Sequence, residues 1–378
     1  MEEQKQRKLQ SKIPSWAGVE GLQLPQSLAL EQCSSEQSAL FKASLLASLL
    51  PESSSIADFT GGLGVDSWAF AGRFSKVFHF ERDAALSAIF EHNIGLLPHK
   101  ASVYCRNAEI TPDFLGQLEE EGFRADCIFL DPARRNREGG KVFLLEECSP
   151  NIMELLPRLA LLSPRLLLKL SPMADITMLI RRLGQNSAGF KLSRIVVLGI
   201  KHEVKELLVL LENGQPASET ELHIINNNIS LNISQIQPGI ALDGTSSERP
   251  FLLEADSVLL KAAAQDLAVQ VFGAQKLAPQ SRLFLCGKEL ERHFGHPLLN
   301  FYKIFRVEEN LPFSKENLRE LSVRHPRLEV SSSLQGLSSE ELQKRMKVRS
   351  GLAPNGLHYH LFACRQEQAK RLLLCSGV

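Results

Sequence analysis

The sequence contains no apolar run as long as the roughly 18 residues that a membrane-spanning helix needs. It also lacks a net charge, since Lys+Arg and Asp+Glu are both 43 in a chain of 378 residues. This balance excludes a histone-like protein and a protein with an acidic tail, although one domain can still carry a basic patch. The charged N-terminus, Met1–Lys8, has no apolar signal-peptide core, so we expect a cytoplasmic protein.

The cysteines are few and scattered. None of the seven stands in a CxxC pair, which disfavours both a disulfide scaffold and a zinc site. We therefore expect reduced thiols in the core and no metal. His358 and His360 share one face of an expected strand, but no acid or cysteine lies near them in the sequence, so they do not predict a metal site either.

Short apolar runs and helical stretches alternate through most of the first 235 residues. Residues 1–50 predict a helical cap, in which Ser34 to Gln37 have capping-box spacing. Residues 51–236 predict strands followed by helices, including a helix near 142–156, and hence an α/β domain with an open, largely parallel sheet covered on both faces. The last two strands, 194–199 and 203–212, are joined too closely for a parallel crossover, so this pair should be antiparallel.

A different unit follows a stretch rich in helix breakers at 237–250. Residues 246–378 predict an α+β domain, with helices such as 255–271 among short strands. This part holds 19 Lys+Arg and 14 Asp+Glu, an excess of five positive charges that favours a polyanion as partner. Its densest basic cluster is Lys344, Arg345, Lys347 and Arg349, which a solvated helix face would also explain.

A glycine loop, Asp58–Asp66, ends the first strand and opens a helix. Glycines at this place let the backbone turn tightly and approach a ligand. The second strand ends in Glu81-Arg82-Asp83, where a carboxylate can accept hydrogen bonds from ribose hydroxyls. The context predicts a nucleoside site, and the alternatives are a nicotinamide dehydrogenase and an ordinary turn between strand and helix.

The pattern D-x-x-G-G-x-G resembles motif I of the class I S-adenosylmethionine-dependent methyltransferases. The resemblance implies that the loop cradles the methionine part, that Glu81 holds the ribose, and that Asn107-Ala108 reads the adenine. The cofactor residues predicted in this way are Asp58, Thr60, Gly61, Gly62, Gly64, Asp66, Glu81, Arg82, Asn107 and Ala108.

The fourth strand runs into Asp131-Pro132-Ala133-Arg134-Arg135, which resembles motif IV of methyltransferases that act on nucleic-acid bases. The Asp131 carboxylate and the Pro132 carbonyl can accept hydrogen bonds from an exocyclic amine and so orient its lone pair. Arg134 and Arg135 can bind phosphates. Ala133 departs from the second proline of the motif and no aromatic residue follows to stack on a base, which weakens the prediction of amine methylation.

Lys169 ends the apolar fifth strand, close to the predicted sulfonium site. The order Lys42, Asp131, Lys169, Glu206 resembles the K-D-K-E tetrad of ribose 2′-O-methyltransferases, in which a desolvated lysine with a lowered pKa would act as a base. The simpler alternatives are a salt bridge, a cap on strand carbonyls or a contact to substrate phosphate. Ser171 stands where RNA uracil-5-methyltransferases need a cysteine, which disfavours covalent catalysis.

As a whole the chain resembles a bacterial family that joins a class I methyltransferase domain to a C-terminal THUMP-like domain. The resemblance rests on Asp58–Asp66, Asp131–Arg135, Lys169–Met173 and Arg249–Ala255. It implies methyl transfer from S-adenosylmethionine to RNA, either transfer or ribosomal, with a base nitrogen favoured over a ribose oxygen. A non-catalytic protein that binds cofactor and RNA, or a methyltransferase with another substrate, are the alternatives.

Overall fold

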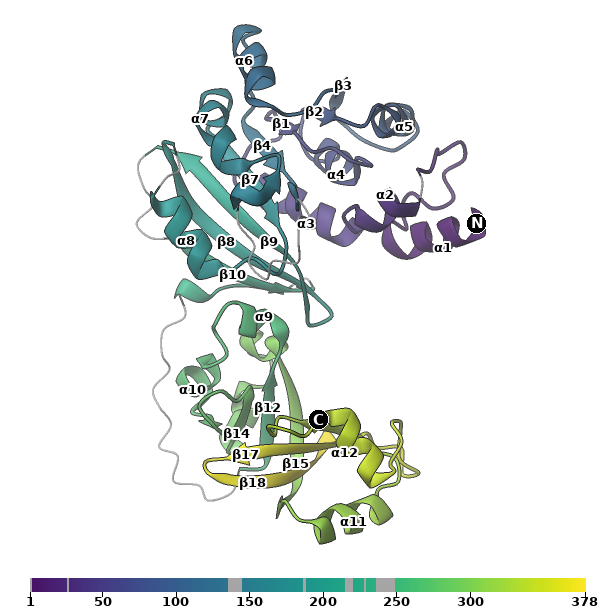
Figure 1. Cartoon of the computed structure of the whole chain (residues 1–378), viewed down its shortest axis with the longest axis vertical. Helices are drawn as coiled ribbons and strands as arrows, with labels where there is room; N and C mark the ends of the chain where they lie inside the picture. The colour runs from purple at the N-terminus through teal and green to yellow at the C-terminus, as the bar shows by residue number, and fades with distance from the viewer. Residues whose placement is uncertain are drawn as a thin grey trace. The chain divides into compact units, whose positions relative to one another are not determined.

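The structure, a computed structural model, describes residues 2–25, 27–134, 145–185, 188–214, 220–227, 229–235 and 249–378. The chain divides into two compact units (Figure 1). Unit 1 comprises Met1–Leu198 and Lys205–Glu221, and unit 2 comprises Gly199–Val204 and Leu222–Val378. The predicted domain boundaries (1–50, 51–236 and 246–378) remain a prediction, and most of the predicted linker lies outside the described residues.

A nine-stranded sheet forms the centre of the fold, with the order β11-β10-β8-β9-β7-β4-β1-β2-β3. Neighbours from β3 to β7 pair in parallel, whereas β9 is antiparallel to β7. The predicted α/β sheet, with a parallel part followed by an antiparallel strand, is confirmed, and β10 and β11 extend it beyond the predicted strands as an antiparallel pair. The strands are β1 Ser55–Asp58, β2 Lys76–Glu81, β3 Ser102–Asn107, β4 Cys127–Leu130, β7 Arg165–Leu170, β8 Phe190–Ile200, β9 Glu203–Asn213, β10 Glu221–Asn226 and β11 Ile229–Asn232.

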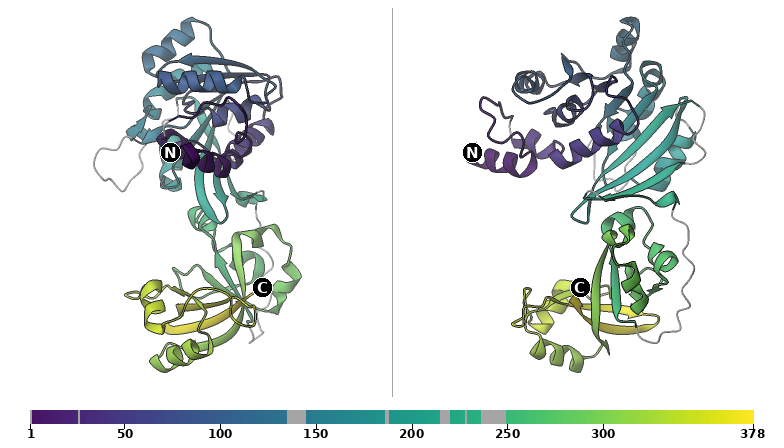
Figure 2. Two further views of the ribbon diagram at one scale, coloured as in Figure 1. Left: turned by 90° about the vertical axis from the view of Figure 1, so that its right-hand side faces the viewer. Right: turned by 180° about the vertical axis from the view of Figure 1, so that it is seen from behind.

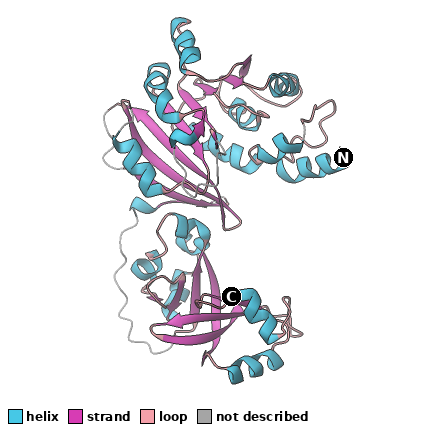
Figure 3. Ribbon diagram, viewed as in Figure 1, coloured by secondary structure: helices cyan, strands magenta, loops and turns pink. Residues whose placement is uncertain are grey.

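Helices lie on both faces of the unit 1 strands (Figure 3). This cover explains why β4 and β7 are almost continuously apolar, since both of their faces are buried. The helices are α1 Glu2–Lys12, α2 Ser27–Gln32, α3 Glu36–Ala47, α4 Val65–Ala71, α5 Ala84–Ile94, α6 Pro112–Glu120, α7 Ile152–Leu162 and α8 Ile176–Gln185. Among the described residues no helix is long and apolar enough to cross a bilayer.

The N-terminal segment is anchored to the glycine-loop helix by aromatic packing. Trp16 is fully buried and meets Trp68 of α4 edge to face, with ring centroids 5.9 Å apart. Asn93 of α5 exchanges two hydrogen bonds of 2.8 Å with the backbone of Gln23. Helices α1 to α3 are therefore part of the same packed body as the sheet, and they can contribute side chains to a site within it.

Unit 2 has a seven-stranded sheet of order β13-β14-β12-β15-β18-β17-β16, seen from two further sides in Figure 2. All its pairs are antiparallel except β16 with β17. Helices α11 and α12 cover one face through an apolar cluster that includes Leu321, Leu342 and Leu361. The elements are β12 Phe251–Ala255, α9 Ser257–Lys261, α10 Leu267–Phe272, β13 Gln275–Lys276, β14 Leu283–Cys286, β15 Tyr302–Pro312, α11 Lys315–Arg324, β16 Glu329–Ser332, α12 Ser339–Met346, β17 Tyr359–Gln366 and β18 Ala369–Gly377.

Some local predictions are wrong. The described part of the helix expected at 142–156 is a 3-10 turn at 145–147 and the two-residue strand β6 Cys148–Ser149, and α7 starts only after its N-cap Asn151. The helix expected at 255–271 is two short helices, because Ala255 ends β12 and residues 262–266 interrupt the helix. Helix α3 is capped by Ser35, not by Ser34.

His358 and His360 of unit 2 do have an acidic neighbour. Parallel pairing sets Glu329 of β16 opposite His360 of β17. The Glu329 carboxylate lies 3.3 Å from His358 Nε2 and 3.6 Å from His360 Nδ1. The acid comes from a neighbouring strand, so proximity along the chain could not reveal it. No group of three or more potential ligands that could hold a metal occurs among the residues that the structure describes.

Candidate functional site

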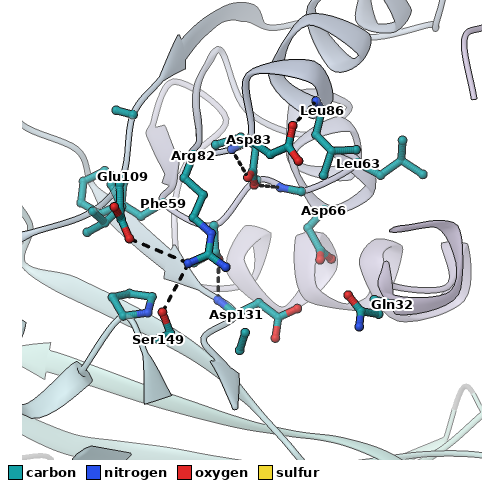
Figure 4. Close-up of a pocket in the computed structure, with 18 of the residues that line it drawn as sticks. Gln32, Phe59, Leu63, Asp66, Arg82, Asp83, Leu86, Glu109, Asp131 and Ser149 are labelled. Atoms are coloured by element: carbon teal, nitrogen blue, oxygen red, sulfur yellow. Dashed lines mark hydrogen bonds and ion pairs between the residues drawn. The ribbon is translucent and has the colours of Figure 1, made fainter. Parts of the chain in front are cut away.

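A cavity of about 780 Å³ opens at the carboxyl ends of β1, β2 and β4. In open α/β sheets this edge is where ligands bind, because the loops that leave adjacent strands diverge there. The cavity combines the glycine loop with residues after β2, β3 and β4, and it extends to the N-terminal segment. Its wall includes Gln32, Cys33, Ser34, Thr60, Gly61, Gly62, Gly64, Asp66, Glu81, Arg82, Ala108, Glu109, Asp131, Ser149 and Asn151, several of which are labelled in Figure 4.

The glycines of the loop are required by space and by backbone angle. A Cβ on Gly61 would lie 2.0 Å from the buried ring of His79, and one on Gly64 would lie 1.9 Å from Phe90. Gly62 and Gly64 have φ of +55° and +83°, which glycine adopts without strain. The loop can therefore pack tightly on β2 and α5 while its backbone faces the cavity.

Glu81 is held in place by backbone donors at the end of β2. Its Oε2 accepts a hydrogen bond of 2.7 Å from Gly62 N–H, and its Oε1 accepts one of 2.7 Å from Asp83 N–H. Each carboxylate oxygen keeps a further lone pair, so the fixed group can accept two more hydrogen bonds from a vicinal diol. These residues therefore fit the ribose of a nucleoside.

Asp58 lies behind the cavity wall. It accepts hydrogen bonds from Ser67 Oγ at 2.6 Å and from Thr60 N–H at 3.1 Å, so it stabilises the loop. Burial raises the pKa of Asp58 to about 7, although Ser67 opposes that rise. The structure thus gives Asp58 a role in holding the loop and no place on the cavity surface.

The two residues predicted to read adenine occupy different positions. Ala108 borders the cavity, together with its neighbour Glu109. Asn107 instead donates from Nδ2 to the carbonyls of Glu81 and Arg82, at 2.7 and 3.1 Å, which ties the end of β3 to the end of β2. The Asn107 side chain is thus engaged with the backbone, whereas Glu109 lies on the cavity wall.

Behind Asp131 lies a buried cluster of charges. Lys169 Nζ donates to Asp131 Oδ2 at 2.5 Å and lies 3.8 Å from Glu206 Oε1. Lys42, on α3, lies 2.8 Å from Glu206 Oε2 and 3.0 Å from Asp66 Oδ1. The cluster therefore brings together Lys42, Asp131, Lys169 and Glu206, which are far apart in the sequence.

The charge balance of this cluster favours bound protons. It holds three carboxylates and two ammonium groups. Burial alone would lower the pKa of Lys169, but Asp131, Glu206 and Asp66 outweigh burial and raise that pKa above its usual value. For the carboxyl group of Asp131 the effects are reversed: burial raises its pKa, and Lys169 opposes that rise. The expected lowering of the Lys169 pKa is therefore wrong, because the neighbouring charges are mostly negative.

The remaining predicted residues fall in several places. Pro132 is buried and is not part of the cavity wall. The backbone of Ala133-Arg134, strand β5, pairs with β6, whereas the Arg134 side chain and all of Arg135 lie outside the described residues. Lys344 and Arg345 are exposed on the last turn of α12 in unit 2. Sequence reasoning missed Gln32, Cys33 and Glu109, for which no local pattern exists, and it assigned Ser34 to a helix cap.

Comparison with solved structures shows which known proteins share the fold of this chain. The chain is similar to a "putative methyltransferase" from Porphyromonas gingivalis W83, with a TM-score of 0.77, 26% identity, and coverage of 99% of this chain and 88% of that one. The fold of this chain is therefore a Rossmann-like methyltransferase fold. No family model and no curated protein matches the chain.

Two further solved structures are more distant. A "putative class I S-adenosylmethionine-dependent methyltransferase" from Listeria monocytogenes has a TM-score of 0.39 and 13% identity, covering 59% of this chain and 73% of that one. A "putative RNA methyltransferase" from Pyrococcus horikoshii has a TM-score of 0.35 and 16% identity, covering 55% of this chain and 96% of that one.

Proposed function

We propose that the protein is an S-adenosylmethionine-dependent methyltransferase that methylates RNA. The observation that carries this proposal is one continuous cavity that joins the glycine loop and Glu81 to Asp131. In a methyltransferase fold, this arrangement sets a nucleoside site beside a carboxylate that can orient an acceptor. The dehydrogenase alternative gives no role to Asp131 and its buried partners.

The cofactor fits the residues that border the cavity. Glu81 would accept hydrogen bonds from the ribose hydroxyls, and the backbone of Gly61 and Gly62 would face the amino-acid part. When bound, S-adenosylmethionine supplies an electrophilic methyl group on a positively charged sulfur. Asp66, Asp131 and Glu206 give this region an excess of negative charge over Lys42 and Lys169, which complements a cation.

Asp131 would orient the acceptor. Lys169 engages its Oδ2, which leaves Oδ1 to accept a hydrogen bond from an N–H or O–H of the substrate. That bond aims the acceptor's lone pair at the methyl group, and positioning is the main requirement of such a displacement. The acceptor loses a proton as it is methylated, and the raised pKa of Asp131 makes its carboxylate a suitable proton acceptor.

A base nitrogen is the first candidate acceptor, through Asp131 and the Pro132 carbonyl. A ribose 2′-oxygen is the second, and one observation favours it: the residues that match the K-D-K-E order are in mutual contact. In that case the Lys169 ammonium would stabilise negative charge developing on the oxygen, since it is cationic and cannot serve as the base. Mass spectrometry of nucleosides from the methylated RNA distinguishes the two.

Unit 2 would hold the RNA backbone. Arg327, Lys344, Arg345, Lys347 and Arg349 are all exposed, and no carboxylate of the described residues forms an ion pair with any of them. Backbone hydrogen bonds of the Arg327–Arg349 bridge hold two arginines side by side, although like charges in such positions repel. A polyanion such as transfer or ribosomal RNA would relieve that repulsion. This cluster is consistent with the predicted THUMP-like character of the unit.

The test compares the isosteric variant Asp131→Asn with Asp113→Asn, an exposed change on α6 outside the cavity. Calorimetry measures binding of S-adenosylmethionine, and transfer of a labelled methyl group is measured on RNA from cells that lack the protein. We expect wild type and Asp113→Asn to bind and transfer, and Asp131→Asn to bind but lose transfer by about 100-fold or more.

Other results would count against specific parts of the proposal. Full transfer by Asp131→Asn would remove its role as the orienting group. Cofactor binding without transfer by wild type, together with salt-dependent RNA affinity, would indicate a non-catalytic binding protein. Cofactor binding without any RNA affinity would point to a small-molecule or protein substrate.

A further inference from the structure

Ser34 occupies the centre of the buried charge cluster. Its hydroxyl donates to Asp66 Oδ2 at 2.6 Å and accepts from Lys169 Nζ at 3.1 Å and from Lys42 Nζ at 3.2 Å. A serine hydroxyl has one hydrogen to donate and two lone pairs that accept. All three are used here, so the direction of each hydrogen bond is fixed by the charge of its partner.

The position of Ser34 is set by the chain on both sides of it. Before it, Lys12 donates from Nζ to the carbonyls of Leu30 and Glu31 and so holds the end of α2. After it, the Ser35 hydroxyl caps α3 by accepting from Ser38 N–H. With these contacts made by its neighbours, Ser34 is free of the capping role and its hydroxyl faces inward. The residue itself is only 4% exposed and borders the cavity.

The Ser34 hydroxyl connects the N-terminal segment to Lys169, which in turn binds Asp131. Lys42 and Lys169 do not bind each other, because both are cations, and their shared contacts are Glu206 and Ser34. Glu206 lies 3.8 Å from Lys169 Nζ, which is too long for a hydrogen bond. Besides Asp131, Ser34 is therefore the hydrogen-bond partner that orients the Lys169 ammonium among the described residues.

We propose that Ser34 is a positioning residue that fixes the Lys169 ammonium against Asp131, and that the N-terminal helical segment is thereby an integral part of the methyl-transfer site. This inference rests on the function proposed above. Without the hydroxyl, Asp66 Oδ2 loses its donor and Lys169 can swing away from the geometry that holds Asp131. A displacement of about 1 Å in such a group is enough to slow a reaction by up to about 100-fold.

The test uses the full-length protein with three variants. Ser34→Ala removes the hydroxyl, Ser34→Thr keeps one, and Ser48→Ala is the control because it removes an exposed hydroxyl from the other end of α3, outside the cluster. Steady-state kinetics give kcat and KM for RNA. NMR of the ¹⁵N-labelled lysine ammonium groups reports the Lys169 signal, assigned from a Lys169→Arg variant, without any need for turnover.

We expect Ser34→Ala to lower kcat by about 10- to 100-fold with little change in KM, and to shift or broaden the Lys169 ammonium signal. Ser34→Thr should restore a large part of kcat. Ser48→Ala should keep kcat and the Lys169 signal, because its hydroxyl is exposed and donates only to the Leu45 carbonyl. Equal losses in Ser34→Ala and Ser48→Ala, or an unchanged Lys169 signal in Ser34→Ala, would overturn the proposal. If wild type transfers no methyl group, the proposed function fails, and the lysine signals still decide whether Ser34 holds Lys169.

Discussion

Replacing Lys42 by methionine removes the only cation that contacts both Asp66 and Glu206 among the residues that the structure describes. The Lys42 side chain is 0% exposed, and the side chains of Asp66 and Glu206 are 10% and 9% exposed. Water therefore compensates poorly for the lost charge. Breaking a buried ion pair by removing one partner typically costs about 3–5 kcal/mol, because the other charge is left without compensation.

The pKa of Glu206 points in the same direction. Burial would raise this pKa, but Lys42 first and then Lys169 lower it to about 2, against an ordinary value of 4.5. Such a difference corresponds to about 3 kcal/mol of stabilisation of the folded state. Because the pKa is lower in the folded state, this stabilisation is complete above the ordinary value and disappears as the pH falls towards 2.

Tryptophan fluorescence is a suitable assay. The chain has two tryptophans, Trp16 and Trp68, and both belong to unit 1, so their emission follows the unfolding of that unit alone. We expect Lys42→Met to lower the free energy of unfolding in urea by about 3 kcal/mol at about pH 7.5. The difference in the free energy of unfolding between wild type and Lys42→Met should be smaller at about pH 5. Without Lys42, burial raises the pKa of Glu206, so that its carboxylate can take up a proton.

Two further variants complete this test. Lys42→Met combined with Glu206→Gln should recover part of the loss, because the unpaired carboxylate is then neutral. Arg7→Met is the control: Arg7 pairs with Glu3 on the exposed surface of α1, where a salt bridge contributes little. A Lys42→Met protein as stable as wild type near neutral pH, or one whose deficit is the same at both pH values, would refute the reasoning.

Three other predictions concern the loop, the ribose site and unit 2. Gly61→Ala should destabilise unit 1 by about 1–3 kcal/mol or more in the same fluorescence assay, because its Cβ has no room, whereas Gly184→Ala, which meets no atom within 4 Å, should be neutral or slightly stabilising. Glu81→Gln should weaken S-adenosylmethionine binding by about 10- to 100-fold in calorimetry, and unchanged affinity would exclude the ribose contact. Lys347→Ala and Arg349→Ala should each reduce the slope of log K for RNA binding against log salt concentration by about one, without changing cofactor affinity. An unaltered slope would mean that the RNA does not contact these residues.

The functional residues that could be predicted from the sequence are those whose role depends on their neighbours in the chain. The glycine loop and Glu81 were identifiable because the loop, the strand and the helix that follow one another carry the pattern themselves. The sheet could be predicted for the same reason, since alternating apolar runs and a link too short for a crossover are properties of neighbouring residues.

The pairing of strands decided what the order of residues could not. Lys42, Asp131, Lys169 and Glu206 matched a known order, but only the placement of β7 between β4 and β9 brings three of them together. The same placement surrounds Lys169 with carboxylates, which reverses the expected direction of its pKa. Glu329 reaches His358 and His360 in the same way, from an adjacent strand.

The sequence by itself determined the α/β architecture, the glycine loop and the acid that ends β2, because hydrophobic period and turn chemistry are short-range properties. Tertiary structure alone decided the charge state of the site and the role of Ser34, which local spacing would assign to a helix cap. The physical reason is that electrostatic energy depends on distance and burial. Both are set by which elements pack together, and neither can be read from separation along the chain.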